Sequence, residues 1–256
     1  MIFNGRNVWV SEKAKLGKNV RIGDNTSIYD NVIIGDDSII SNNCVIGEPQ
    51  AKYYSDNSYL NKATAIGSHS LIRSHSIIYS GTTIGSHFNT GHRITIRENT
   101  VIGHHSRVGT DTDIQDGVII GNYCWLHSGI FIPLGVVLED FVFVYPHVVF
   151  TNDKNPPSST LSGAHVGKYA QIGAAATLMP GIEIGENAMI GAGSVVTKNV
   201  APFTLVAGNP AVVLKKLHPE NYSENGSSSN AWMYHFERGM PWEGIGFDNW
   251  KRGNKE

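Results

Sequence analysis

A repeat of six residues dominates the chain. Fifteen positions spaced six apart run from Ile66 to Phe150, and all but Thr90 and Phe150 are aliphatic. An amphipathic helix repeats about every 3.6 residues and a half-buried strand about every two, so neither explains this period. A short fixed repeat is typical of solenoids, and a six-residue repeat predicts an all-β parallel β-helix.

The repeat continues on both sides of that stretch. It begins at Val10, runs to Ile46, and resumes from Val166 to Val196. The fifth position of each block is small or apolar, so positions one and five are expected to point inward. Three blocks would form one triangular coil of 18 residues, and coils stack at roughly 4.8 Å. The sequence therefore predicts about nine coils, with Cys44 and Cys124 as core residues.

Turn-forming residues occupy the third and fourth positions of the blocks, as in Asp24-Asn25 and Glu186-Asn187. The fourth position favours residue types that tolerate a left-handed backbone. Five of the eleven histidines fall there, so backbone geometry explains them better than chemistry does. These five are His69, His75, His87, His105 and His147.

Two breaks in the repeat predict loops at 48–65 and 151–165, inside a β-helix domain spanning 1–201. Loops held on a rigid scaffold often carry function. The remainder, 202–256, forms a C-terminal segment with three of the five tryptophans between Trp232 and Trp250. So many aromatic residues predict that this tail packs on the prism or on a neighbouring subunit.

The formal net charge of −2 gives no indication of a nucleic-acid partner. No apolar run approaches the ~18–20 residues that span a bilayer, and the N-terminus lacks the apolar core of a signal peptide. We therefore expect a cytoplasmic protein without a membrane span. Two cysteines are too few for a disulfide scaffold or a cysteine zinc site.

Winding the sequence at 18 residues per coil shows which blocks share a face. Blocks opening at 72, 90, 108, 126 and 144 stack together, and those at 172 and 190 continue the same face after the second loop. His92 and His127 lie on it outside the left-handed position, which makes them candidates for chemistry. Gly173-Ala174 and Gly191-Ala192 form a strip nearly free of side chains, where an extended ligand could approach the backbone. Asn152 and Asp153 belong to the next corner.

Several motifs resemble a known family. IGAGSVVTKNV and VAGNPAVV resemble the hexapeptide-repeat acyltransferases, whose fold is a left-handed parallel β-helix. The combination of TGHR, LHS and TND resembles, more narrowly, the N-acetyltransferases of nucleotide-linked amino sugars, including dTDP-3-amino-3,6-dideoxyhexoses. The resemblance covers about residues 1–215 and implies a role in surface polysaccharide synthesis, such as lipopolysaccharide O-antigen.

The resemblance also implies a homotrimer with active sites between neighbouring prisms, using acetyl-CoA and no metal. His127 is the expected general base, because an imidazole titrates near neutral pH, and Asn152 is expected to orient the acceptor. Arg93 and Arg97 are expected to contact the pyrophosphate. The remaining expected site residues are His92, Glu98 and Asp153 for the substrate, and Gly173, Ala174, Gly191, Ala192, Lys198, Ala207 and Pro210 for acetyl-CoA.

Two other functions compete with this one. An O-acetyltransferase of the same fold needs the same base and the same acyl donor, so the motifs separate it poorly. A γ-type carbonic anhydrase needs three zinc-binding histidines, one followed about 36 residues later by a pair five apart. His92 and His127 are 35 apart, but residue 132 is isoleucine, so the pattern is incomplete.

Overall fold

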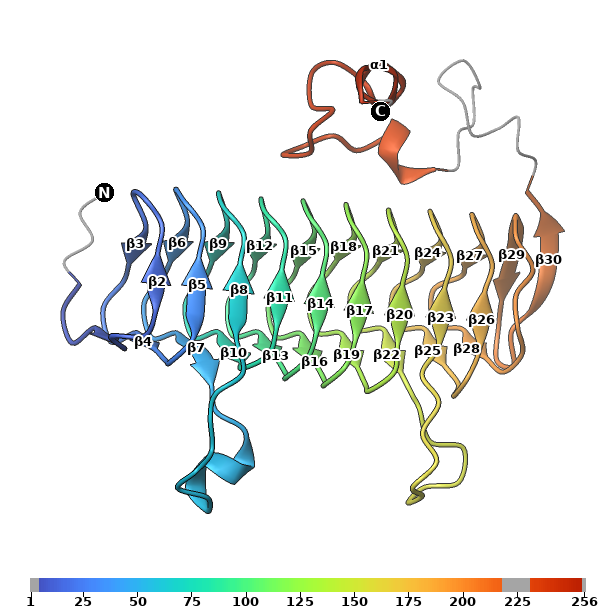
Figure 1. The fold of residues 1–256 in the computed structure, drawn as a ribbon. Helices are drawn as coiled ribbons and strands as arrows, with labels where there is room; N and C mark the ends of the chain where they lie inside the picture. The colour runs from blue at the N-terminus through green and yellow to red at the C-terminus, as the bar shows by residue number, and fades with distance from the viewer. Residues whose placement is uncertain (1–4, 218–230, 255–256) are drawn as a thin grey trace.

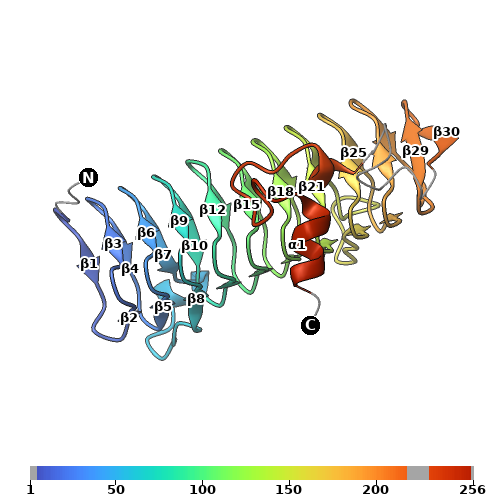
Figure 2. The same cartoon turned by 90° about the horizontal axis from the view of Figure 1, so that it is seen from above.

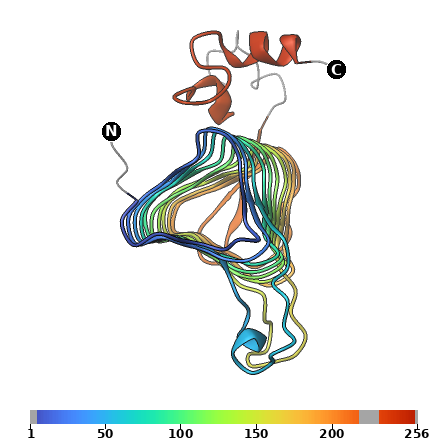
Figure 3. The same ribbon diagram turned by 60° about the vertical axis from the view of Figure 1, so that its left-hand side comes forward.

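A computed structural model describes residues 5–217 and 231–254. Three parallel sheets form the faces of a long triangular prism, with one strand of each sheet in every coil (Figures 1 and 3). Paired strands are 18 residues apart, as in Ile78 with Ile96 and Ile96 with Ile114. The predicted parallel β-helix is therefore confirmed, whereas its left-handed winding stays a prediction of the resemblance.

Sheet A has ten strands. Both long loops leave the corner that follows its strands and hang from the same side of the prism (Figure 3). We call this corner the loop edge; it carries η1 (Ala51–Tyr54) in the first loop. The strands of sheet A are β1 (Trp9–Val10), β4 (Ser27–Ile28), β7 (Val45–Glu48), β10 (Ile77–Tyr79), β13 (Thr95–Ile96), β16 (Asp113–Ile114), β19 (Phe131–Ile132), β22 (Val149–Phe150), β25 (Thr177–Leu178) and β28 (Val195–Val196).

Sheet B has nine strands, and the corner that follows them is the aromatic edge. Six rings stack along this edge with neighbouring centroids 4.4 to 5.2 Å apart, namely those of His69, His87, His105, Tyr123, Phe141 and Tyr169. The strands of sheet B are β2 (Lys15–Leu16), β5 (Val32–Ile34), β8 (Thr64–Ile66), β11 (Thr83–Ile84), β14 (Val101–Ile102), β17 (Ile119–Ile120), β20 (Val137–Leu138), β23 (His165–Val166) and β26 (Glu183–Ile184).

Sheet C has eleven strands and continues past residue 201, because β29 pairs with β27 in parallel. We call the corner between sheets C and A the histidine edge, since His92 and His127 follow strands of sheet C. The strands of sheet C are β3 (Arg21–Ile22), β6 (Ile39–Ile40), β9 (Leu71–Ile72), β12 (Asn89–Thr90), β15 (Arg107–Val108), β18 (Trp125–Leu126), β21 (Phe143–Val144), β24 (Gln171–Ile172), β27 (Met189–Ile190), β29 (Thr204–Ala207) and the antiparallel β30 (Val212–Lys216).

The core of the prism consists of the predicted inward positions. Isoleucine, valine and leucine at position one and small residues at position five fill it, and Cys44 and Cys124 are fully buried within it. Burial raises the pKa of the Cys124 thiol to about 12, which keeps it protonated and unreactive. All five fourth-position histidines have φ between 58° and 62°, so their predicted left-handed conformation is confirmed.

The C-terminal tail packs on its own prism, which was one of the two predicted outcomes (Figures 1 and 2). Residues 231–254 carry η3 (Trp232–Tyr234) and α1 (Phe247–Gly253), and their aromatic side chains cover Phe141 and Phe143. The Trp232 indole donates a hydrogen bond to the Phe141 carbonyl at 2.8 Å. The tail thus covers part of the aromatic edge and the adjoining outer face of sheet C. The rest of the predicted C-terminal segment, 218–230 and 255–256, lies outside the described residues.

Candidate functional site

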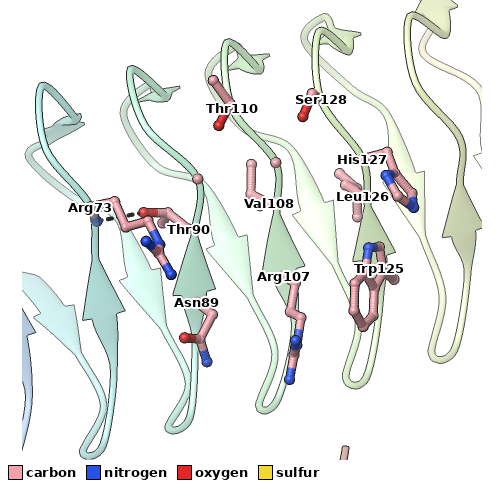
Figure 4. A pocket seen from close by; sticks show the side chains of 12 residues that line it. Arg73, Asn89, Thr90, Arg107, Val108, Thr110, Trp125, Leu126, His127 and Ser128 are labelled. Atoms are coloured by element: carbon pink, nitrogen blue, oxygen red, sulfur yellow. Dashed lines mark hydrogen bonds between the residues drawn. The ribbon is translucent and has the colours of Figure 1, made fainter. Parts of the chain in front are cut away.

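A cavity of about 270 Å³ opens on the outer face of sheet C, beside the histidine edge (Figure 4). It crosses β12, β15 and β18, and it contains His127, the predicted base. No acidic side chain lines it, whereas two arginines do. The lining residues are Arg73, Asn89, Thr90, Gly91, Arg107, Val108, Gly109, Thr110, Trp125, Leu126, His127 and Ser128.

Two glycines form the floor of this cavity because adjacent coils leave no room for a side chain. A Cβ on Gly91 would lie 2.2 Å from the backbone nitrogen of Thr110, and one on Gly109 would lie 2.5 Å from the carbonyl carbon of His127. Real Cβ contacts are longer than this, so glycine is required by coil stacking. The same requirement leaves an open floor between Arg73 and His127.

Aromatic rings position the His127 imidazole. Its centroid lies 6.0 Å from Trp125, 5.5 Å from Phe143 and 5.9 Å from Tyr145, and it is nearly parallel to the last of these. Burial among these rings lowers the pKa of His127 below its usual range. The imidazole is therefore neutral at physiological pH and able to accept a proton.

Two arginines close the cavity, and neither was among the predicted site residues. The guanidinium of Arg107 lies over the Trp125 ring at 4.6 Å and donates to the Gly239 carbonyl of the tail. Phe236 of the tail packs edge-on against Trp125 at 4.5 Å. Arg73 is exposed at the other end and points into the cavity in Figure 4. The signal was present, since Asn89, Arg107 and Trp125 share the outward sixth position at 18-residue spacing.

The polar side chain of Thr90, an exception in the aliphatic repeat, has a structural explanation. The backbone N–H of Arg73 donates to the Thr90 hydroxyl at 2.8 Å (Figure 4). In neighbouring coils the equivalent N–H donates to a backbone carbonyl, as Gly91 does to Val108. The hydroxyl thus replaces a carbonyl acceptor beneath the cavity.

His92 and Arg93 also lie on the histidine edge, two coils before His127. The Nδ1 atom of His92 is 2.9 Å from the Ser74 hydroxyl. Arg93 forms a bidentate ion pair with Asp111, with N···O distances of 2.8 and 2.9 Å. These contacts satisfy much of the hydrogen-bonding capacity of both side chains, and neither residue lines the cavity.

The other predicted substrate residues lie on the loop edge. Arg97 pairs with Glu98 through two hydrogen bonds and lies over the Tyr79 ring at 5.0 Å. The Asn152 side chain donates to the Leu134 carbonyl at 3.0 Å, which leaves its amide oxygen available. The carboxylate of Asp153 accepts hydrogen bonds within its own loop, and those from Ser158 lower its pKa. Asp153 therefore organises the second loop.

One chain does not bring the two predicted catalytic residues together. His127 follows β18 of sheet C, whereas Asn152 follows β22 of sheet A. The width of sheet A separates their edges, and Asn152 lies two coils further along the prism. Two coils alone correspond to roughly 10 Å, so a single acceptor amine cannot contact both residues of one chain.

The predicted acetyl-CoA residues also divide between the two edges. Gly173, Ala174, Gly191 and Ala192 continue the histidine edge, whereas Lys198 follows β28 and lies exposed on the loop edge. A Cβ on Gly173 would lie 2.6 Å from the backbone nitrogen of Ala192, so coil stacking also requires this glycine.

The end of the strip is formed by the last coil. Ala207 at the end of β29 lies against Gly191, where a Cβ on the glycine would be 2.7 Å from that of the alanine. Pro210 follows directly in the turn before β30, and the neighbouring Gly208 and Ala211 are hydrogen-bonded to Val195. The strip thus ends at Ala207 and Pro210.

Two searches concern the described residues alone. Within 5–217 and 231–254, no three histidine, cysteine, aspartate or glutamate side chains are grouped as a metal site requires. The helices in these ranges are too short to cross a bilayer.

Comparisons with known proteins agree with this fold. Residues 13–48 and 163–198 match the family model described as bacterial transferase hexapeptide (six repeats). A chloramphenicol acetyltransferase of Klebsiella aerogenes is 43% identical over 51 residues, covering 20% of this chain and 24% of that protein. The serine acetyltransferase of Buchnera aphidicola subsp. Schizaphis graminum is 39% identical over 56 residues, 22% of each chain.

A solved structure resembles this one over a longer range. The Arabidopsis UDP-N-acetylglucosamine acyltransferase superposes with a TM-score of 0.54 at 19% identity, covering 88% of this chain and 77% of that one. Similarity at this identity concerns the fold. The chain spans no more than 30% of the length of the curated relatives cited here or their close equivalents.

Proposed function

Because the chain belongs to the hexapeptide-repeat family of bacterial transferases, we propose that it transfers an acetyl group from acetyl-CoA to the amine of a nucleotide-linked amino sugar. The observation that carries this proposal is the cavity beside His127. It combines a neutral imidazole, two arginines and an open glycine floor, and the bare strip continues along the same edge.

The chemistry requires few groups. The sugar amine attacks the thioester carbonyl, the carbon–sulfur bond breaks, and CoA leaves as a thiolate. His127 accepts the proton that the amine loses and returns it to the sulfur. Holding the two reactants together supplies much of the rate increase.

The separation of the two edges supports a site shared between copies in a homotrimer. In this arrangement His127 and the Gly173–Ala192 strip come from one prism, and Asn152 and Lys198 come from the loop edge of its neighbour. Asn152 has a free amide oxygen to orient the acceptor amine. Lys198 is exposed and can pair with an anionic group of CoA.

The acceptor is tested by incubating the purified protein with acetyl-CoA and a panel of UDP- and dTDP-linked amino sugars, with release of free CoA thiol as the readout. At least one amino sugar nucleotide is expected to react, and mass spectrometry should show an acetamide. The matching hydroxy sugar nucleotides serve as controls. Reaction of these controls alone would favour O-acetylation, and no reaction with any nucleotide-linked sugar would refute the proposal.

A further inference from the structure

A second cavity, distinct from the one beside His127, lies under the first loop near the N-terminal end of the prism. Its volume is about 210 Å³, and residues of β1, of the turn after β4 and of the loop line it. None of these residues belongs to the predicted site. They are Trp9, Lys13, Tyr29, Asp30, Asn31, Tyr53, Tyr59, Leu60 and Asn61.

Aromatic rings form the walls of this cavity. Tyr29 lies 5.2 Å from Trp9 and 6.4 Å from Tyr53, and Tyr53 lies 6.1 Å from Tyr59, each pair edge to face. Trp9 and Tyr53 are each about half exposed, at 50% and 49%, so their rings are accessible to a ligand. Such rings stack on planar heterocycles, and one stacked base contributes about 1–3 kcal/mol to binding.

The polar groups of the cavity favour a neutral heterocycle over a cation. Asp30 is the carboxylate among the lining residues, and it already pairs with Lys13 at 2.9 Å. The amide of Asn61 is fixed by donating to the Gly47 carbonyl at 2.8 Å. Its Oδ1 is buried without a hydrogen-bond partner in the described structure, which is costly unless a ligand donor completes it. Uracil and thymine carry such a donor at N3, and cytosine does not.

The position of the cavity agrees with a nucleotide-linked substrate. Tyr29 lies on the loop edge three coils before Arg97, about 14 Å along the prism at the usual strand spacing. His127 follows one coil later. In a trimer of parallel prisms, the same coils of neighbouring chains lie at equal heights. A base under the first loop, a pyrophosphate near Arg97 and a sugar beside the neighbour's His127 therefore fall in the order of the substrate.

We propose that this cavity binds the uracil or thymine base of the acceptor, stacked against Tyr53 and hydrogen-bonded through N3–H to Asn61 Oδ1. This proposal rests on the proposed function, because it places one end of the same substrate. It adds a site to the loop edge and assigns the first loop to nucleotide recognition.

The test uses titration calorimetry of the full-length protein with UDP, dTDP and CDP. UDP or dTDP is expected to bind at least tenfold more tightly than CDP, which carries the same phosphates but lacks the N3–H donor. Tyr53→Leu should weaken UDP binding at least tenfold, whereas Tyr53→Phe, which keeps the ring, should bind like the wild type. Circular dichroism and the thermal midpoint check that each variant is folded.

The outcomes separate this proposal from the proposed function. Equal binding of UDP, dTDP and CDP, or unchanged UDP binding by folded Tyr53→Leu, overturns the base site even if amino sugars are acetylated. Base-selective binding that depends on Tyr53 supports the base site even if no amino sugar reacts. In that case only the acceptor proposal fails.

Discussion

Replacing His127 with alanine is expected to lower kcat by about 10²–10⁴-fold, the usual contribution of a general base. The side chain lines the cavity and is held by aromatic contacts, so its loss removes the proton acceptor with little effect on the coil. The KM for acetyl-CoA should change little, because the strip that would hold it lies further along the edge. Initial rates of thiol release measure both constants.

The pH profile provides an independent readout of the same residue. Because burial lowers the pKa of His127, the base stays unprotonated well below the ordinary histidine range. The wild-type kcat/KM should therefore fall on the acid side with a midpoint below about 6.5, and this limb should disappear in His127→Ala. His75→Asn on the same edge is the matched control and should leave both profiles unchanged. A His127→Ala enzyme with wild-type kcat would rule out the base.

Replacing Trp242 with alanine is expected to undock the C-terminal tail. Trp242 is fully buried and lies 5.2 Å from Phe247 and 5.7 Å from Trp232 in the cluster between tail and prism. Loss of a buried tryptophan costs about 3–5 kcal/mol. The prism has its own separate core, so it should stay folded while residues 231–254 become susceptible to protease. Limited proteolysis followed by mass spectrometry measures the change.

The same variant should affect the cavity, because the tail contacts two of its walls. Arg107 donates to the Gly239 carbonyl, and Phe236 packs on Trp125. Undocking removes both contacts, so the KM for the acceptor should rise while the KM for acetyl-CoA stays near its wild-type value. Ile245→Ala, an exposed change in the same tail, is the control. A Trp242→Ala protein that resists protease like the wild type would contradict this account of the tail.

The repeat predicted the fold because a residue's place in the prism depends only on its position within 18 residues. The same arithmetic predicted that Ile172 continues the sheet of Val144 after the second loop, as the pairing confirms. It also had the power to place Lys198 on the loop edge, since the residue lies eight positions after Ile190 and therefore one corner further.

Other features depend on contacts that the repeat does not encode. The choice of Asp111 as the partner of Arg93, and of Glu98 as that of Arg97, depends on side-chain conformations. The tail has no repeat, so its aromatic residues indicated burial without indicating which face they cover. Glycines on the bare strip were expected to admit a ligand, whereas coil stacking already requires Gly173 whether or not a ligand binds.

The central claim is that His127 and Asn152 act on the same substrate from two different chains. Its most direct test mixes the inactive or weakened variants His127→Ala and Asn152→Ala in equal amounts by co-expression. In randomly mixed trimers, about a quarter of the shared sites would combine an intact His127 with an intact Asn152 from the neighbour. The mixture should therefore recover about a quarter of wild-type activity. A mixture no more active than the mean of its two parents would contradict a site shared between chains.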